Sequence, residues 1–162
     1  MTSLRGPNAV DLTLNVNGHD RSVHVPPRFS LLDTLRGPLG LTGTKLVCDE
    51  GDCGACTVLI DDRPVYSCLT LAIATEGRRV ETIEGLSQDG TLHPVQEAFV
   101  EHDAYQCGFC TPGQVMSVVS LLRAKPDARE DDVRRAVSGN LCRCGAYPNI
   151  VAAGVAAAKK KR

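Results

Sequence analysis

The chain has 162 residues, of which 43% are hydrophobic, and its formal net charge is −1. This length allows one domain or two small ones. The charge excludes the strongly basic footprint of most nucleic-acid binders. No apolar run reaches the roughly 18 residues of a membrane span, and the N-terminus has no export-signal pattern. We therefore expect a cytoplasmic protein with no nucleic-acid partner and no membrane span.

The first half of the chain has the pattern of a small mixed sheet. Apolar and polar residues alternate before Asn17-Gly18, a pair typical of a hairpin turn. Ser30 is a candidate N-cap for a short helix. The expected elements are strands at 12–16, 23–25, 57–60, 65–66 and 79–82 and a helix at 31–36. Two hairpins and one helix predict an α+β roll.

The second half has the period of helices. We expect helices at about 95–100, 112–124, 130–137 and 148–159. Thr111 is the expected N-cap of the second of these, with Pro112 at its first position. The chain is thus predicted to form a sheet domain over 1–84, a linker over 85–91 and a small helical bundle over 92–162.

The eight cysteines are the unusual feature of the composition. Disulfide frameworks belong mainly to secreted domains, and no export signal supports that interpretation. The first four are Cys48, Cys53, Cys56 and Cys68, spaced C-x4-C-x2-C with a fourth Cys after eleven more residues. This is the plant-type 2Fe–2S ferredoxin spacing. Structural zinc sites usually show two C-x2-C pairs instead, so this quartet predicts an iron–sulfur centre.

The other four cysteines are less diagnostic. They are Cys107, Cys110, Cys142 and Cys144, a C-x2-C pair followed 31 residues later by a C-x-C pair. Structural zinc and a redox-active C-x2-C remain open on spacing alone. Each pair precedes an expected helix start, whose positive end favours an anionic cluster.

Three stretches around these cysteines resemble the small iron–sulfur subunit of the molybdenum hydroxylases, the family of xanthine dehydrogenase, aldehyde oxidoreductases and aerobic carbon monoxide dehydrogenase. They are Thr42 to Lys45 leading into Cys48–Val58, Gln106 to Gly113, and Gly139 to Tyr147. The resemblance runs from about residue 11 to 158. It implies a ferredoxin-like β-grasp domain followed by a four-helix bundle, with one 2Fe–2S cluster in each.

The resemblance also implies partners and a direction of electron flow. Electrons would leave a molybdopterin centre, in its cytosine dinucleotide form, on a large subunit. They would enter the cluster of the helical domain, pass to the ferredoxin-like cluster and leave through FAD on a medium subunit, in a heterotrimer or a dimer of heterotrimers. Gln106 matches the residue that contacts the pterin, although an N-cap or a loop hydrogen bond is an alternative role. Cys144 matches the cluster ligand nearest the pterin.

Two positions depart from the family pattern. Val47 stands where many relatives have glycine before the first ligand, and Gly145-Ala146 replaces the Thr-Gly of carbon monoxide dehydrogenase-like members. The latter favours an aldehyde, a purine or another N-heterocycle over carbon monoxide as the substrate of the complex.

A free-standing ferredoxin would leave the helical half unexplained, and a zinc-bound interaction module is the remaining alternative.

Overall fold

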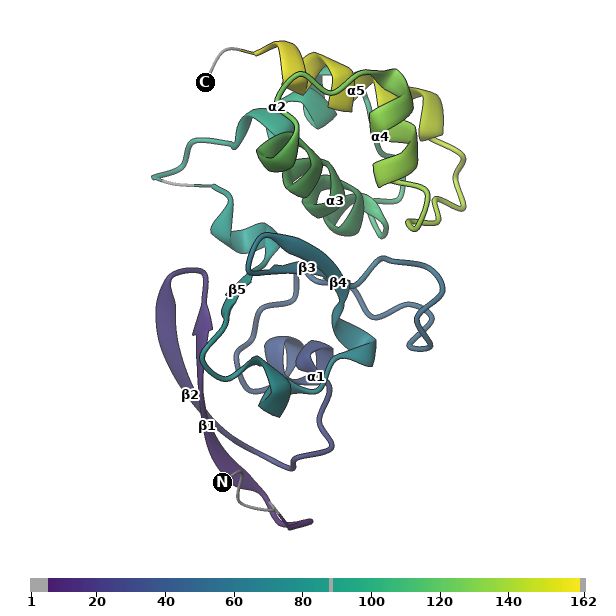
Figure 1. The fold of residues 1–162 in the computed structure, drawn as a ribbon. Coiled ribbons are helices and arrows are strands. Elements are labelled where there is room, and N and C mark those ends of the chain that lie inside the picture. Colours follow the sequence, from purple (N-terminus) through teal and green to yellow (C-terminus); the bar gives the residue numbers. More distant parts are fainter. Residues whose placement is uncertain (1–5, 88, 161–162) are drawn as a thin grey trace.

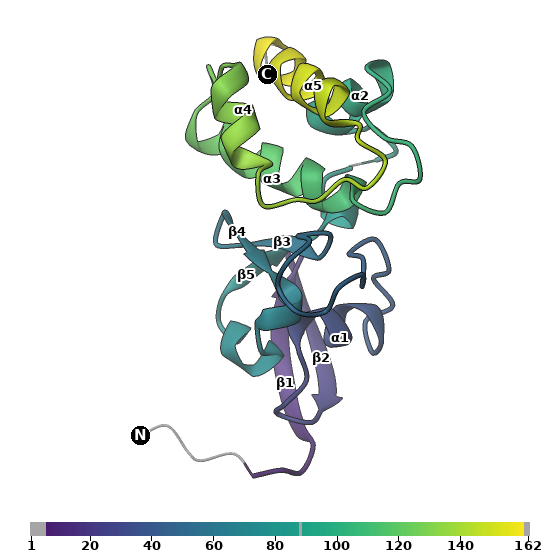
Figure 2. The ribbon, with the colours of Figure 1, turned by 90° about the vertical axis from the view of Figure 1, so that its right-hand side faces the viewer.

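The computed structural model describes residues 6–87 and 89–160. The outermost residues of both expected domains, and position 88 of the expected linker, therefore lie outside the described residues. Figures 1 and 2 show a sheet with one helix in the first half and the remaining helices gathered against one end of it. This arrangement confirms the expected α+β class.

The first half contains a five-stranded mixed sheet in the order β2-β1-β5-β3-β4. Its strands are β1 (Val10–Val16), β2 (His19–Val25), β3 (Thr57–Ile60), β4 (Arg63–Tyr66) and β5 (Arg79–Glu81). β1 pairs antiparallel with β2 and parallel with β5, and β3 pairs antiparallel with β4 and β5. Asn17 and Gly18 both take the positive φ that the predicted hairpin turn requires.

Helix α1 (Leu31–Arg36) packs against the sheet and begins where its sequence predicts. The Ser30 hydroxyl accepts a hydrogen bond from the Asp33 N–H, and the Asp33 carboxylate accepts one from the Ser30 N–H, which completes a capping box. Leu31 and Leu35 are fully buried in the first core, together with Leu14. This core forms the inner face of the sheet.

The second half contains four α-helices, which are α2 (Pro94–Glu101), α3 (Thr111–Ala124), α4 (Glu130–Ala136) and α5 (Tyr147–Lys159). Each contributes to a second core, in which Phe99, Met116, Val133 and Ile150 are almost fully buried. The expected start of α3 is wrong by one residue, because the Gln114 N–H donates to the Cys110 carbonyl and makes Cys110 the N-cap. α5 likewise begins at Tyr147, one residue before the expected start.

Strand β3 joins the two cores. All four of its residues are buried. Val58 and Ile60 belong to the first core, whereas Leu59 belongs to the second core with the helices. Because successive residues of a strand point to opposite faces, one face of the sheet covers α1 and the other receives α3.

Polar contacts also connect the halves through Asn140, which precedes α5 and is 3% exposed. Its amide nitrogen donates to the Gly54 carbonyl at 2.8 Å and to the Thr57 hydroxyl at 3.1 Å. Its amide oxygen accepts from the Ser117 hydroxyl at 2.8 Å, and its backbone carbonyl accepts from the Gln114 side chain at 2.9 Å. We call these residues, with Asn140 at the centre, the Asn140 joint.

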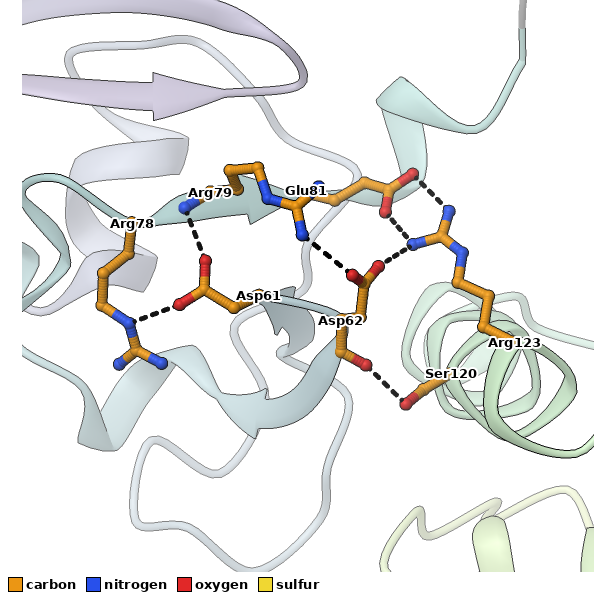
Figure 3. A network of polar contacts seen from close by, with 7 residues as sticks. All are labelled: Asp61, Asp62, Arg78, Arg79, Glu81, Ser120 and Arg123. Carbon is orange, nitrogen blue, oxygen red and sulfur yellow. Dashed lines mark hydrogen bonds and ion pairs between the residues drawn. The ribbon is translucent and has the colours of Figure 1, made fainter.

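A second set of contacts lies at the far end of α3 (Figure 3). The Arg123 guanidinium pairs with Glu81 of β5, with Nη2 to Oε1 at 2.9 Å, and with Asp62 in the β3–β4 turn at 2.8 Å. Ser120 donates to the Asp62 backbone carbonyl at 2.9 Å. Asp62 also pairs with Arg79 at 3.0 Å, so one carboxylate ties α3 to the sheet edge.

Gly54→Ala is expected to destabilise the chain more than Gly40→Ala. Both glycines have left-handed φ angles, +67° and +65°, so alanine suffers the same backbone strain of roughly 1–2 kcal/mol at each site. Only the added methyl group at Gly54 would clash, because it meets the rigid Gly139 carbonyl, whereas the space at Gly40 is open. We expect a further loss of about 1–3 kcal/mol for Gly54→Ala in urea denaturation. Equal losses in the two variants would contradict this packing.

Arg123→Gln is expected to lower the free energy of unfolding by about 1 kcal/mol, because Glu81 and Asp62 lose a partly buried partner. Arg134→Gln is the matched control, since Arg134 pairs with Glu130 on an exposed helix face. The control should change stability by less than about 0.5 kcal/mol. Thermal unfolding of the two variants side by side measures the difference, and a larger effect in the control would refute it.

Candidate functional site

The first cysteine quartet lies on the loop between α1 and β3 and on the turn after β4. The loop curls tightly, with left-handed backbone at Asp49, Gly51 and Gly54. Cys53 and Cys56 are buried beneath it, and Cys48 is partly exposed. Cys68 comes from the 3-10 turn η1 (Ser67–Leu69). The loop geometry thus brings three cysteines to a fourth that follows after eleven intervening residues.

Backbone N–H groups point at the sulfur of Cys48. Those of Glu50 and Cys53, and then that of Asp52, lower the pKa of the Cys48 thiol to about 6. The Cys53 N–H lies 3.4 Å from this sulfur. Such a ring of donors stabilises an anionic sulfur, which is one way in which proteins hold and tune iron–sulfur clusters.

The other end of the quartet is a close pair of thiols, of which Cys56 is buried and Cys68 half-buried. The sulfurs of Cys56 and Cys68 are 3.4 Å apart. Burial, followed by the hydrogen bond with Cys56, raises the pKa of the Cys68 thiol to about 12. A negative charge on the nearby Cys48 sulfur raises the pKa of Cys68 further. The pair of Cys48 and Cys53 therefore lies near the pair of Cys56 and Cys68. A thiol of this kind loses its proton when a metal ion coordinates it.

The second quartet lies between two turns that precede helices. Cys107 and Cys110 lie on the turn before α3, and Cys142 and Cys144 lie on the turn before α5. Gly108 and Gly145 take left-handed conformations in these turns. The Cys142 N–H donates to the Tyr147 hydroxyl at 2.8 Å, which fixes the second turn against the start of α5.

The sulfurs of the two turns pair with each other, although 31 residues separate Cys110 from Cys142 in the sequence. Cys110 and Cys142 interact through their thiols, and burial first and then this contact raise the pKa of Cys110 to about 12. Cys107 interacts with Cys144, and its pKa is lowered, first by the Phe109 N–H and then by the Cys144 contact. Each pair therefore takes one cysteine from each turn.

These arrangements fit clusters that contain two irons. All eight cysteines are free thiols. Among the residues that the structure describes, no group of three or more Cys, His, Asp or Glu side chains is gathered tightly enough for one metal ion. The thiols instead stand in two pairs in each quartet, and a Cys-ligated 2Fe–2S cluster uses two thiolates for each of its irons. The left-handed glycines leave room for a loop to wrap around such a group.

The remaining predicted site residue is exposed. Gln106 lies next to the exposed Cys107, and no hydrogen bond from its side chain to another described residue is present, so the alternative role in a loop hydrogen bond finds no support. Val47, the departure from the family pattern, is 54% exposed and leaves the neighbouring Cys48 in its quartet. Phe109 and Leu141 are also exposed beside the second quartet.

Sequence reasoning missed the residues that connect the two quartets. Asn140 lies two positions before Cys142, and its amide bonds to Gly54, which lies between Cys53 and Cys56. Gln114 and Ser117, which complete the joint, are buried polar residues three apart on α3. Their spacing on an otherwise apolar helix face was the available signal, because buried polar groups need partners.

Comparison with known proteins identifies both halves. Residues 14–85 match the model of the 2Fe-2S iron-sulfur cluster binding domain, and residues 82–154 match that of the [2Fe-2S] binding domain. The chain is therefore built around two iron–sulfur centres, and the expectation of a ferredoxin-like first half is confirmed. None of the helices in the described residues has the length and apolar character of a membrane span.

Relatives of known function share nearly the whole chain. The nicotine 6-hydroxylase small subunit of Paenarthrobacter nicotinovorans is 50% identical, over 94% of this chain and 92% of its own. The aldehyde oxidoreductase iron-sulfur-binding subunit PaoA of Escherichia coli K12 is 47% identical, over 91% of this chain and 71% of its own. A chain of quinoline 2-oxidoreductase from Pseudomonas putida 86 superposes with a TM-score of 0.90 at 46% identity, covering 94% of this chain and 95% of that one. The protein belongs to the family of small iron–sulfur subunits of the molybdenum hydroxylases, and it is a non-catalytic electron-transfer subunit of an oxidoreductase.

Proposed function

We propose that each cysteine quartet binds one 2Fe–2S cluster. The ligands are Cys48, Cys53, Cys56 and Cys68 for the first cluster and Cys107, Cys110, Cys142 and Cys144 for the second. The observation that carries this proposal is the convergence of each quartet into two pairs of thiols. Buried, mutually close thiols are costly as thiolates unless a positive group binds them, and two iron ions supply that charge.

We also propose that the chain is organised as two cluster domains. The ferredoxin-like domain spans 1–84, the linker 85–91 and the helical domain 92–162. The four helices α2–α5 around one core support the description of the second domain as a four-helix bundle. In this arrangement, the turns before α3 and α5 form the cluster site at one end of the bundle.

The partners follow from the two clusters. Substrate oxidation releases two electrons, and each 2Fe–2S centre carries one at a time, so two clusters in series let them leave singly. We propose that electrons come from a molybdopterin cytosine dinucleotide centre on a large subunit and leave through FAD on a medium subunit, in a heterotrimer or its dimer. The exposed Cys107 and Gln106 support entry at the second cluster, with Gln106 as a contact to the pterin.

The substrate of the complex is proposed to be an aldehyde or an N-heterocycle, such as a purine, rather than carbon monoxide. The names of two relatives, an aldehyde oxidoreductase and a nicotine 6-hydroxylase, support these two classes. We propose that the complex lies in the cytoplasm, where thiols are kept reduced. Sequencing the chains that co-purify with the native protein tests the partners, and a native protein that purifies without any partner chain would contradict them.

Single substitutions should remove one cluster at a time. Cys110→Ala is expected to lose half of the iron and acid-labile sulfide of the purified chain while the first cluster keeps its spectrum, because that variant leaves the first quartet intact. Cys56→Ala is the reciprocal control and should keep only the second cluster. Metal analysis with electron paramagnetic resonance of the reduced chain measures both. Zinc without sulfide in the wild-type chain would refute the proposal.

In the assembled enzyme, Cys110→Ala should abolish turnover with the usual acceptor, because the first electron acceptor after the molybdenum centre is missing. Steady-state assays with that acceptor, and with a dye that oxidises the molybdenum centre directly, separate the two steps. We expect turnover with the usual acceptor to be lost and turnover with the dye to be retained. Full turnover with the usual acceptor after loss of the second cluster would show that electrons take another route.

A further inference from the structure

One backbone hydrogen bond connects the two proposed cluster sites. The Leu141 N–H donates to the Cys53 carbonyl at 2.8 Å. Cys53 belongs to the first quartet, and Leu141 directly precedes Cys142 of the second. A path from one sulfur to the other therefore runs along the covalent bonds of Cys53, across this single hydrogen bond, and along those of Leu141 and Cys142.

The Asn140 joint fixes both ends of that bond. The Asn140 amide donates to the carbonyl of Gly54, which follows Cys53, while the backbone of Asn140 leads directly into Leu141. Ser117 and Gln114 hold Asn140 from α3. A methyl group on Gly54 would overlap the Gly139 carbonyl, and one on Gly113 would overlap the Gly54 carbonyl. The two loops thus meet without intervening side chains.

The Arg123 contacts between the halves are poorly placed to carry electrons. Arg123 lies in the last turn of α3, whereas Cys110 caps its first turn. A helix of 14 residues separates these ends by about 20 Å. The ion pairs of Arg123 with Glu81 and Asp62 therefore hold the halves together at a distance from the cysteine loops.

We infer that the hydrogen bond from Leu141 to Cys53 is the route of electron transfer between the two clusters. Asn140 is the positioning residue that holds this hydrogen bond in place. The inference rests on the proposed cluster ligands. In the transfer, one electron leaves the reduced second centre and enters the oxidised first centre. No covalent bond forms or breaks, and the proton stays on the Leu141 nitrogen.

The test compares Asn140→Leu with Arg123→Gln in the full chain carrying both clusters. Leucine resembles asparagine in shape and adds no charge, but it removes every hydrogen bond of the side chain. Loss of these buried bonds should speed exchange of the Leu141 amide hydrogen about tenfold or more, which corresponds to about 1.4 kcal/mol or more. Arg123→Gln loosens the halves elsewhere and should leave that exchange rate unchanged. Ser117→Ala is a milder variant that weakens the joint from α3.

Electron transfer itself is then followed by rapid-freeze electron paramagnetic resonance after reduction by one equivalent. Asn140→Leu should slow the transfer severalfold, Ser117→Ala should slow it less, and Arg123→Gln should match the wild type. The midpoint potentials of both centres are measured in each variant and should not change, which excludes an altered driving force.

Three results would overturn the route. The first is an unchanged transfer rate in Asn140→Leu although Leu141 exchanges faster. The second is equal slowing in Arg123→Gln, which would show a general need for contact between the halves. The third is failure of both Asn140→Leu and Ser117→Ala to assemble two clusters, which would make the joint a folding element. A wild-type chain without two 2Fe–2S signals would instead refute the proposed function.

Discussion

The side-chain amide of Asn140 is the contact on which the relation of the two halves depends. It is almost completely buried, so its donors and acceptor need partners from the protein itself. Those partners come from both halves, with Gly54 and Thr57 on one side and Ser117 on the other. The amide is satisfied only when the sheet, α3 and the loop before α5 are all in place. A polar group thereby specifies one arrangement of two otherwise apolar surfaces.

The two quartets differ in their surroundings. In the first, three backbone N–H groups converge on Cys48, and two of the four cysteines are buried. In the second, Cys107 is exposed while Cys110 and Cys142 are buried. Hydrogen bonds to sulfur and solvent exposure both set the potential of a cluster. The fold therefore gives the two proposed centres different electrostatic environments.

Local chemistry made much of the fold predictable from the sequence. The left-handed Asn17-Gly18 turn and the Ser30 cap are marked by local sequence patterns, and both form as expected. Thr111 is not the cap that was expected, because the helix begins at Thr111 itself and Cys110 is its N-cap. Helix ends differ by such single residues because several neighbouring carbonyls can accept the first helical hydrogen bond. The spacing of the first quartet was equally local, whereas the second quartet is assembled only by tertiary packing.

The contacts between the halves were not predictable for the same reason. The run Thr57 to Ile60 is continuous in its burial, so no alternation marked Leu59 as a residue of a second core. Because both faces of β3 are buried, the two halves are not independent modules. A ferredoxin-like half separated from its helices would present Leu59 to water and lose the partner of the Gly54 loop. Each half thus completes the other's interior, and recombination that exchanged one half for a foreign one would have to preserve the surface around β3.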